Sequence, residues 1–360
     1  MLLSVGYGQG HNSAATAMEE HYVDKGWEAI TLDICELAHP WLFRLTQIFY
    51  GFCVRRAPWL WGVTYSLTDT ADWAAMVKRP FFRRMVYTMR REIEKWQPDA
   101  VLCTYPLFAY LLDALQDDGV CVPPYAIVVT DAREISRPWM RSRAPRVFVI
   151  DPESQRSVVL RYALSAYMVK VSGFPVRKNF QPRGSGVHPN TELRILYGAY
   201  RQTRGVINDI AALLSAFPQL KLTVLAGGRN QKIRNSFSHE CASGRLIVLA
   251  HTDRMAELLS NSHFYVGKAG AATMFECYAA NVPVLVNFTL PGQEQGNLEL
   301  LVDDAAGCHV ESTSHLIRTV QNLLEDDAQG WRLMCAAMKQ SGRADGVVKI
   351  AGELDDMLSI

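Results

Sequence analysis

A run of small residues between a lysine and a glutamate has the composition of an anion-binding turn. It extends from Val266 to Glu276 (VGKAGAATMFE) and predicts a strand end, a turn and a helix start. Such a turn lets backbone N–H groups approach a phosphate, and the helix dipole attracts an anion. Thr273 can donate a hydroxyl hydrogen bond, and Glu276 can accept hydrogen bonds from a ribose diol. Small residues at such a junction can also serve packing alone.

A second polar loop follows the next predicted strand. Residues 291–297 are Pro-Gly-Gln-Glu-Gln-Gly-Asn, directly after the strand expected at Val284–Phe288. The side chains of Gln293, Glu294 and Asn297 can form several hydrogen bonds to vicinal hydroxyls, which makes a sugar the natural ligand. A plain loop would need no ligand. Phosphate and ribose contacts on one loop, and hydroxyl contacts on the next, favour a nucleotide-sugar.

These loops must be positioned by strands that alternate with helices. Short apolar runs predict buried strands of a parallel sheet with helices on both faces. The runs lie at Leu2–Val5, Ala29–Leu32, Ala100–Thr104, Tyr125–Thr130 and Val147–Ile150, and then at Arg194–Tyr197, Lys221–Ala226, Arg245–Ala250, Phe264–Val266 and Val284–Val286. A stretch rich in proline and glycine, from Gly173 to Pro189, interrupts the pattern.

The expected architecture is therefore α/β, with two Rossmann-like domains and a cleft between them. We expect an N-terminal domain at 1–178, a linker at 179–190 and a C-terminal domain at 191–345, with a final helix at 346–360 that can pack back onto the first domain. Ligands should bind beyond the C-terminal ends of the strands, where the loops gather.

Composition narrows the class of protein. The chain has 360 residues, 20% of them charged and 49% hydrophobic, which is ordinary for a globular protein of about two domains. The net charge of +1 argues against a nucleic-acid binder. The eight cysteines form no C-x-x-C pair, so they predict buried thiols of a cytosolic protein instead of a zinc or redox site. Neither a signal peptide nor a membrane-spanning helix is expected.

The near-neutral total conceals an asymmetry. Residues 1–183 carry 22 Lys and Arg against 18 Asp and Glu, whereas residues 184–360 carry 15 against 18. The basic excess concentrates at 40–95, where cationic and aromatic residues interleave at helical spacing. This pattern suits a peripheral contact with anionic lipid at a membrane interface. It also suits a helical layer packed on a core, with a solvated basic face.

The motifs in their order resemble the family 28 glycosyltransferases, above all the monogalactosyldiacylglycerol synthases and the processive diacylglycerol glucosyltransferases. The resemblance covers nearly the whole chain. It rests on G-x-G-x-G-H-N-S-A-A at 6–15, Pro58-Trp59-Leu60-Trp61, Val129-Thr130-Asp131, S-G-F-P-V-R at 172–177, A-G-G-R-N at 226–230, K-A-G-x-x-T-x-x-E at 268–276, P-G-Q-E-x-G-N at 291–297 and Ala306-Gly307.

The resemblance implies a GT-B fold whose C-terminal domain binds a UDP-sugar and whose N-terminal domain binds a lipid acceptor at the membrane. The donor residues it implies lie at the diphosphate (Gly270, Ala271, Thr273), the ribose (Glu276), the sugar hydroxyls (Gln293, Glu294, Asn297), the uracil (His251, Thr252) and the donor side of the cleft (Gly227, Arg229). The acceptor side it implies comprises Gly8, Gly10, Trp59, Trp61 and Arg137.

His11 and Asp131 are the candidate catalytic residues. The histidine that matches His11 in the family faces the acceptor, and imidazole titrates near working pH, which suits a general base. A histidine here could instead only cap the helix that begins near Asn12. Asp131 closes a buried strand, and it could be the base or the group that orients His11.

Three departures from the family pattern are notable. Gly270-Ala271 replaces two adjacent glycines, Arg137 replaces the histidine of a His-Pro-x-Trp pattern, and Gly198 is followed by Ala199-Tyr200-Arg201 in place of a glycine run. The last two lie where the cleft is expected, so they bear on acceptor identity, linkage and catalytic strength.

The resulting expectation is an inverting glycosyltransferase that uses no cofactor and no metal, since no Asp-x-Asp stands in either cleft loop. It would move glucose or galactose from UDP-glucose or UDP-galactose to a lipid, most simply diacylglycerol, at the inner face of the cell membrane. His11 or Asp131 would deprotonate the acceptor hydroxyl, and the turn at Gly270–Thr273 with Arg229 would stabilise the departing UDP. Two alternatives stay open: a polyprenyl-linked or soluble acceptor, and a non-catalytic nucleotide-sugar sensor on the same fold.

Overall fold

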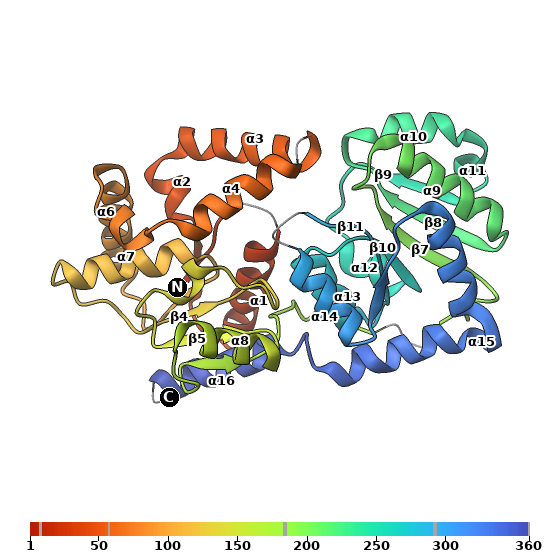
Figure 1. Cartoon of the computed structure of the whole chain (residues 1–360). Coiled ribbons are helices and arrows are strands. Elements are labelled where there is room, and N and C mark those ends of the chain that lie inside the picture. Colours follow the sequence, from red (N-terminus) through yellow and green to blue (C-terminus); the bar gives the residue numbers. More distant parts are fainter. Residues whose placement is uncertain (7–8, 57, 183–185, 291–293, 359–360) are drawn as a thin grey trace. The chain divides into compact units, whose positions relative to one another are not determined.

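The computed structural model describes residues 1–6, 9–56, 58–182, 186–290 and 294–358. In these residues the strands form two parallel six-stranded sheets (Figure 1). Contacts divide the chain into two compact units. Unit 1 comprises 1–177, 290–296 and 343–360, and unit 2 comprises 178–289 and 297–342.

Unit 1 holds the sheet with the strand order β2-β1-β3-β4-β5-β6. Its strands are β1 (Leu2–Leu3), β2 (Thr31–Leu32), β3 (Val101–Cys103), β4 (Tyr125–Val128), β5 (Arg146–Val149) and β6 (Val169–Val171). Its helices are α1 (Gly10–Asp24), α2 (Ile34–Ala38), α3 (Pro40–Arg56), α4 (Pro58–Thr70), α5 (Trp73–Met76), α6 (Pro80–Trp96), α7 (Pro106–Asp117), the 3-10 helix η1 (Arg137–Met140), α8 (Pro152–Tyr162) and α16 (Gly346–Leu358).

Both faces of this sheet are covered, which explains why its strands are apolar without alternation. Successive side chains point to opposite faces of a strand. Leu3, Val101 and Cys103 accordingly join the core beneath α6 and α7, whereas Leu2 and Leu102 join a second core with α1 and α16. Figure 1 shows α1 and α16 near each other on that side.

Unit 2 holds the sheet with the order β12-β11-β10-β7-β8-β9. Its strands are β7 (Leu193–Gly198), β8 (Leu220–Leu225), β9 (Leu246–Leu249), β10 (Phe264–Lys268), β11 (Val284–Phe288) and β12 (Gly307–His309). Its helices are α9 (Thr203–Ala216), the 3-10 helix η2 (Gly227–Arg229), α10 (Asn230–Ser236), α11 (Ser238–Ala242), α12 (Met255–Ser260), α13 (Ala271–Ala280), α14 (Gln295–Asp303), which begins at the unit boundary, and α15 (Thr313–Ser341). The strand order reverses between β7 and β10, the place where doubly wound sheets bind ligands.

The expected α/β architecture with two parallel sheets is confirmed. Strands β6 and β12 were not predicted, because each has only three residues and includes a polar one. The contacts also differ from the expected boundaries in two short segments, since residues 343–345, expected in the C-terminal domain, group with unit 1. Residues 290–296 group with unit 1, although the sequence pattern placed them in the C-terminal domain.

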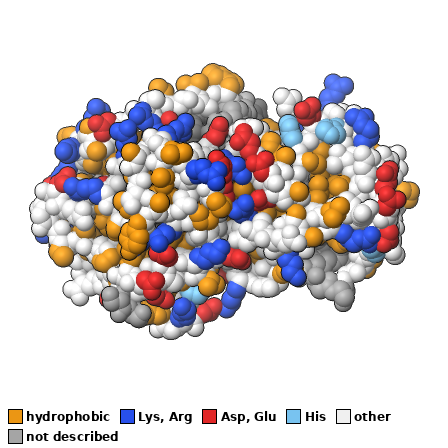
Figure 2. All heavy atoms as spheres, turned by 60° about the horizontal axis from the view of Figure 1, so that its bottom comes forward, with side chains coloured by type: hydrophobic (Ala, Val, Ile, Leu, Met, Phe, Trp, Pro, Cys, Tyr) orange, Lys and Arg blue, Asp and Glu red, His pale blue; other side chains and the backbone are white. Residues whose placement is uncertain are grey.

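The surface carries charges of both signs. Figure 2 shows Lys and Arg interspersed with Asp and Glu, and apolar side chains scattered among them, on the face it presents. On α6, Arg83 pairs with Asp118 at 2.8 Å and Arg90 with Glu94 at 2.6 Å. No helix in the described part of the chain combines the length and apolarity needed to cross a bilayer.

Candidate active site

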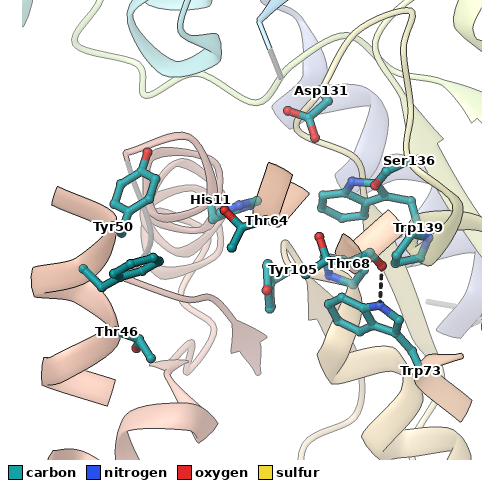
Figure 3. A pocket seen from close by; sticks show the side chains of 13 residues that line it. His11, Thr46, Tyr50, Thr64, Thr68, Trp73, Tyr105, Asp131, Ser136 and Trp139 are labelled. Atoms are coloured by element: carbon teal, nitrogen blue, oxygen red, sulfur yellow. Dashed lines mark hydrogen bonds between the residues drawn. The ribbon is translucent and has the colours of Figure 1, made fainter. Parts of the chain in front are cut away.

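A cavity of about 290 Å³ in unit 1 lies beyond the C-terminal ends of β1, β3 and β4 (Figure 3). His11 enters it from the first turn of α1, Tyr105 from the end of β3, and Asp131 from the segment after β4. Helices α3 and α4 close the opposite side with hydroxyl and aromatic side chains, among them Tyr50 and Thr64. The topology of the sheet therefore brings both candidate catalytic residues to one cavity.

The ring of His11 is buried and held through Nδ1. This nitrogen lies 2.6 Å from the Thr104 carbonyl oxygen and 3.1 Å from Thr130 Oγ1. A carbonyl can only accept, so we assign the proton of the neutral ring to Nδ1, which leaves the lone pair on Nε2. Burial lowers the pKa of His11 to about 4, because it disfavours the imidazolium. These contacts are with the loops after β3 and β4, so the ring does not act as a cap of α1.

Asp131 has the opposite electrostatic behaviour. Its carboxyl has a pKa raised to about 7, chiefly because burial disfavours the carboxylate; the hydrogen bond from the Trp139 indole lowers the pKa, and the negative charge of Glu294 raises it. The Asp131 side chain is 7% exposed and lines the cavity. This carboxyl therefore titrates in the range in which a general base works best.

The other acceptor-side predictions fall into different places. Gly10 begins α1, and Gly8 lies outside the described residues. Trp61 lies in α4, and Trp59 is 68% exposed on the same helix and does not line the His11 cavity. Arg137 begins η1, and it lines a neighbouring hollow that shares Trp73 and Pro138 with the cavity.

The predicted phosphate-binding turn forms the start of α13 in unit 2. Gly270 is the residue before the helix and, as a glycine, has no side chain with which to cap its first turn. The N–H groups of that turn can therefore meet a ligand anion. Ala271 and Thr273 are half-buried in the first turn, and Glu276 is buried one turn later. The local structure thus agrees with the expected strand, turn and helix.

Arg229 serves the neighbouring loop in this structure. Its Nη1 donates to the carbonyl oxygens of Ala199 at 2.8 Å and of Arg201 at 2.6 Å. These bonds fasten the loop that follows β7, and the expected contact of this guanidinium group with the departing UDP stays a prediction. Gly227 begins η2 with a φ of +56°, a left-handed value that glycine adopts without strain.

The turn predicted for the uracil follows β9. His251 is exposed there, and Thr252 is half-buried, with its Oγ1 accepting a hydrogen bond from the Arg254 N–H at 3.0 Å. The hydroxyl-binding loop is divided between the units. Glu294 belongs to unit 1, where its Oε2 accepts from the Leu290 N–H.

Asn297 belongs to unit 2 and ties two of its elements together. Its Nδ2 donates to the Ala269 carbonyl at 3.0 Å, which braces the turn before α13. Gln293 lies outside the described residues. Gly296 belongs to unit 1 and packs closely within it, since a Cβ there would lie 2.1 Å from the Ala132 carbonyl oxygen.

A buried polar cluster near the end of β7 was missed by the sequence reasoning. Asp209 of α9 is fully buried and accepts from Tyr197 Oη at 2.7 Å and from Arg201 Nη1 at 3.0 Å. Thr313 also donates to it. The available signal was an aspartate between Val206 and Ile210, on the apolar face of α9. This cluster anchors the segment Ala199-Tyr200-Arg201 that stands where the family has a glycine run.

Two family models match the chain in sequence. Residues 11–176 match the model described as monogalactosyldiacylglycerol (MGDG) synthase, and residues 204–350 match the glycosyltransferase family 28 C-terminal domain.

Curated relatives match over most of their length. The chain is 24% identical to "Monogalactosyldiacylglycerol synthase, chloroplastic" of Spinacia oleracea, an alignment that covers 99% of this chain and 72% of that protein. It is also 24% identical to "Processive diacylglycerol beta-glucosyltransferase" of Bacillus cytotoxicus, with 91% and 86% covered.

Solved structures share the fold. MurG of Acinetobacter baumannii superposes with a TM-score of 0.61 at 17% identity, over 99% of this chain and 98% of that one. UGT71G1 of Medicago truncatula, complexed with UDP-glucose, gives 0.62 at 11% identity over 99% and 97%. At these identities the likeness establishes the GT-B-like fold alone.

Proposed function

Because this chain is a family 28 glycosyltransferase, distantly homologous to the MGDG synthases and the processive diacylglycerol glucosyltransferases, we propose that it transfers a hexose from a UDP-sugar to the hydroxyl of a membrane lipid, diacylglycerol being the simplest fit. The observation that carries this proposal is the cavity that contains His11 and Asp131 and is walled by α3 and α4. It offers a proton acceptor for an alcohol beside a mostly apolar wall.

Asp131 is the general base of the proposed reaction. A carboxylate with a pKa of about 7 is largely ionised just above neutrality and is a far stronger base than an imidazole with a pKa of about 4. The acceptor oxygen attacks the anomeric carbon, its proton passes to Asp131, and the bond from that carbon to UDP breaks. Attack opposite the leaving group inverts the anomeric centre and gives a β-linked product from an α-linked donor. His11 lines the same cavity and bounds the position of the acceptor alcohol, whose single hydroxyl proton goes to Asp131.

The departing UDP gains negative charge at its diphosphate. The uncapped N–H groups at the start of α13 can stabilise this charge without reorganisation. Thr273 adds a hydroxyl, and Glu276 accepts from the ribose. His251 and Thr252 bind the uracil, and Asn297 holds the turn in place. Glu294 and Gln293 are the sugar-hydroxyl ligands of this proposal.

The acceptor reaches the enzyme from a membrane surface in this proposal. Outward-facing side chains on α3 and α4 form an exposed apolar stripe, which we call the outer stripe. It consists of Trp41, Leu45, Ile48, Phe52, Trp59, Val63 and Leu67. Their spacing of three and four residues puts them on one side of each helix, away from Thr46, Tyr50, Thr64 and Thr68 of the cavity.

The outer stripe has the character of an interfacial anchor. Exposed tryptophans and aliphatic residues on paired helices enter the headgroup region, whereas monomers seldom leave so many exposed together. In the basic stretch at 40–95, Arg83 and Arg90 pair with acids. Docking of this stretch on anionic lipid stays a prediction, and the outer stripe adds an apolar contact to it. The membrane so contacted is the inner face of the cell membrane.

Product analysis tests the proposal. The protein is incubated with diacylglycerol vesicles and with UDP-glucose or UDP-galactose, and the lipids are examined by mass spectrometry beside an Asp131→Asn control. A hexosyl-diacylglycerol that appears only with the unmodified protein supports the proposal. Product with a polyprenyl phosphate or a soluble alcohol, and none with diacylglycerol, contradicts the acceptor. UDP binding without turnover on any acceptor would indicate the sensor.

A further inference from the structure

The segment after β7 places a tyrosine at the reversal point of the sheet in unit 2. β7 and β10 are adjacent, with Tyr197 opposite Val266, so the ends of these two strands lie side by side. Tyr200 follows β7, and Lys268 is the last residue of β10. The Lys268 ammonium lies over the Tyr200 ring, 5.6 Å from its centroid, within the range of a cation–π interaction.

The surrounding backbone leaves room for this ring. A Cβ at Gly198 would lie 2.6 Å from Tyr200 Cε2, so the ring occupies the space above a glycine. In the segment Gly198-Ala199-Tyr200-Arg201, the ring of Tyr200 therefore packs over Gly198, the one glycine left where the family pattern has a glycine run.

The segment is also anchored on both sides of Tyr200. Arg229 donates to the carbonyls of Ala199 and Arg201, and the Arg201 guanidinium reaches the fully buried Asp209. A backbone held at the carbonyls on both sides of Tyr200 has little freedom to move, which limits the positions that the ring can take.

From this arrangement we propose that Tyr200 is a positioning residue, which holds the Lys268 ammonium beside the start of α13 so that the charge meets the donor diphosphate. This inference rests on the proposed UDP-sugar donor. Lys268 precedes the uncapped turn of α13 by two residues, so its charge adds to that of the N–H groups there.

Binding of UDP and of uridine tests the proposal. Calorimetry compares wild type with Tyr200→Leu and Tyr200→Phe for both ligands. Uridine lacks phosphates, so a residue that acts through the Lys268 charge affects UDP alone. We expect Tyr200→Leu to weaken UDP binding by about tenfold, which is the loss of affinity that corresponds to one partly desolvated cation–π contact. Uridine binding should be unchanged, and Tyr200→Phe, which keeps the ring, should bind UDP as the wild type does.

Two further variants sharpen the result. Lys268→Met should weaken UDP binding at least as much as Tyr200→Leu, and the double variant should be no weaker than Lys268→Met. Tyr167→Leu is the matched control, because Tyr167 lies over Arg146 and Lys170 on unit 1 and should leave both ligands unaffected.

Other results would refute either the role of Tyr200 or the proposed UDP-sugar donor. Equal loss of UDP and uridine in Tyr200→Leu would show a structural role and refute the inference, as would unchanged UDP binding. Independent, additive losses in the double variant would also refute it. A wild-type protein that binds no UDP would instead refute the proposed donor.

Discussion

The pH dependence of turnover should follow the ionisation of Asp131. Its pKa lies near 7 because burial disfavours the carboxylate. A base must be unprotonated, so kcat/KM should be level above pH 7 and should fall by about tenfold for each pH unit below it. Asp131→Asn, which preserves shape, should lose ~10²–10⁴-fold in kcat, the usual contribution of a general base. The assay is UDP release with diacylglycerol vesicles at pH 5 to 9.

The fall of kcat/KM below pH 7 is the acidic limb of the pH profile, and two neighbours of Asp131 should shift it in opposite directions. Trp139→Phe removes the hydrogen bond that stabilises the carboxylate, so the pKa of Asp131 rises and the limb shifts to higher pH by about one unit. Glu294→Gln removes a nearby negative charge, so the pKa falls and the limb shifts to lower pH. UDP binding by each variant, measured separately, controls for damage to the donor side.

The alternative base gives a different profile. If His11 takes the proton, the limb should lie near pH 4, because burial lowers the pKa of His11 to about 4. A kcat/KM profile that stays level from pH 9 down to pH 5, in the wild type and in Trp139→Phe and Glu294→Gln, would refute the assignment to Asp131. So would an Asp131→Asn enzyme of near-normal rate beside an inactive His11→Gln enzyme.

Three further outcomes are expected. When the pH falls from 7.5 to 5, the wild type should lose on the order of 2 kcal/mol of unfolding free energy that His11→Gln keeps. The reason is that the histidine binds a proton near pH 6.5 in the unfolded chain but only near pH 4 in the folded one. Urea titrations in which both proteins lose the same unfolding free energy between these pH values would contradict this. Arg201→Met should destabilise the fold by about 3 kcal/mol in the same assay, since it leaves Asp209 buried without its cation, and Arg204→Met on the exposed side is the control. Replacing Ile48 and Leu67 by serine should abolish flotation with anionic vesicles, whereas the same change at the exposed Leu333 and Val348 should not; flotation that survives the first pair would discount the outer stripe.

The sequence alone determined the architecture and the donor turn. Apolar runs such as Tyr125–Val128 are local signals, since a strand buried on both faces must be apolar throughout. The turn before α13 is equally local, because a strand end, small residues and a helix start follow one another in the chain. A resemblance of ordered motifs then indicated the family, which the matching family models confirmed.

Only the tertiary structure decided which groups act together. Asp131 and Glu294 are far apart in the chain, and their charges interact because residues 290–296 pack against unit 1. Arg229 was expected to meet UDP, and only the structure shows that its Nη1 donates to two carbonyls after β7. A pKa depends on burial and on neighbours from other elements, and a side chain's task depends on what it reaches. Residue type and spacing therefore indicate the candidate functional residues, and tertiary packing determines the burial and the neighbours of each one.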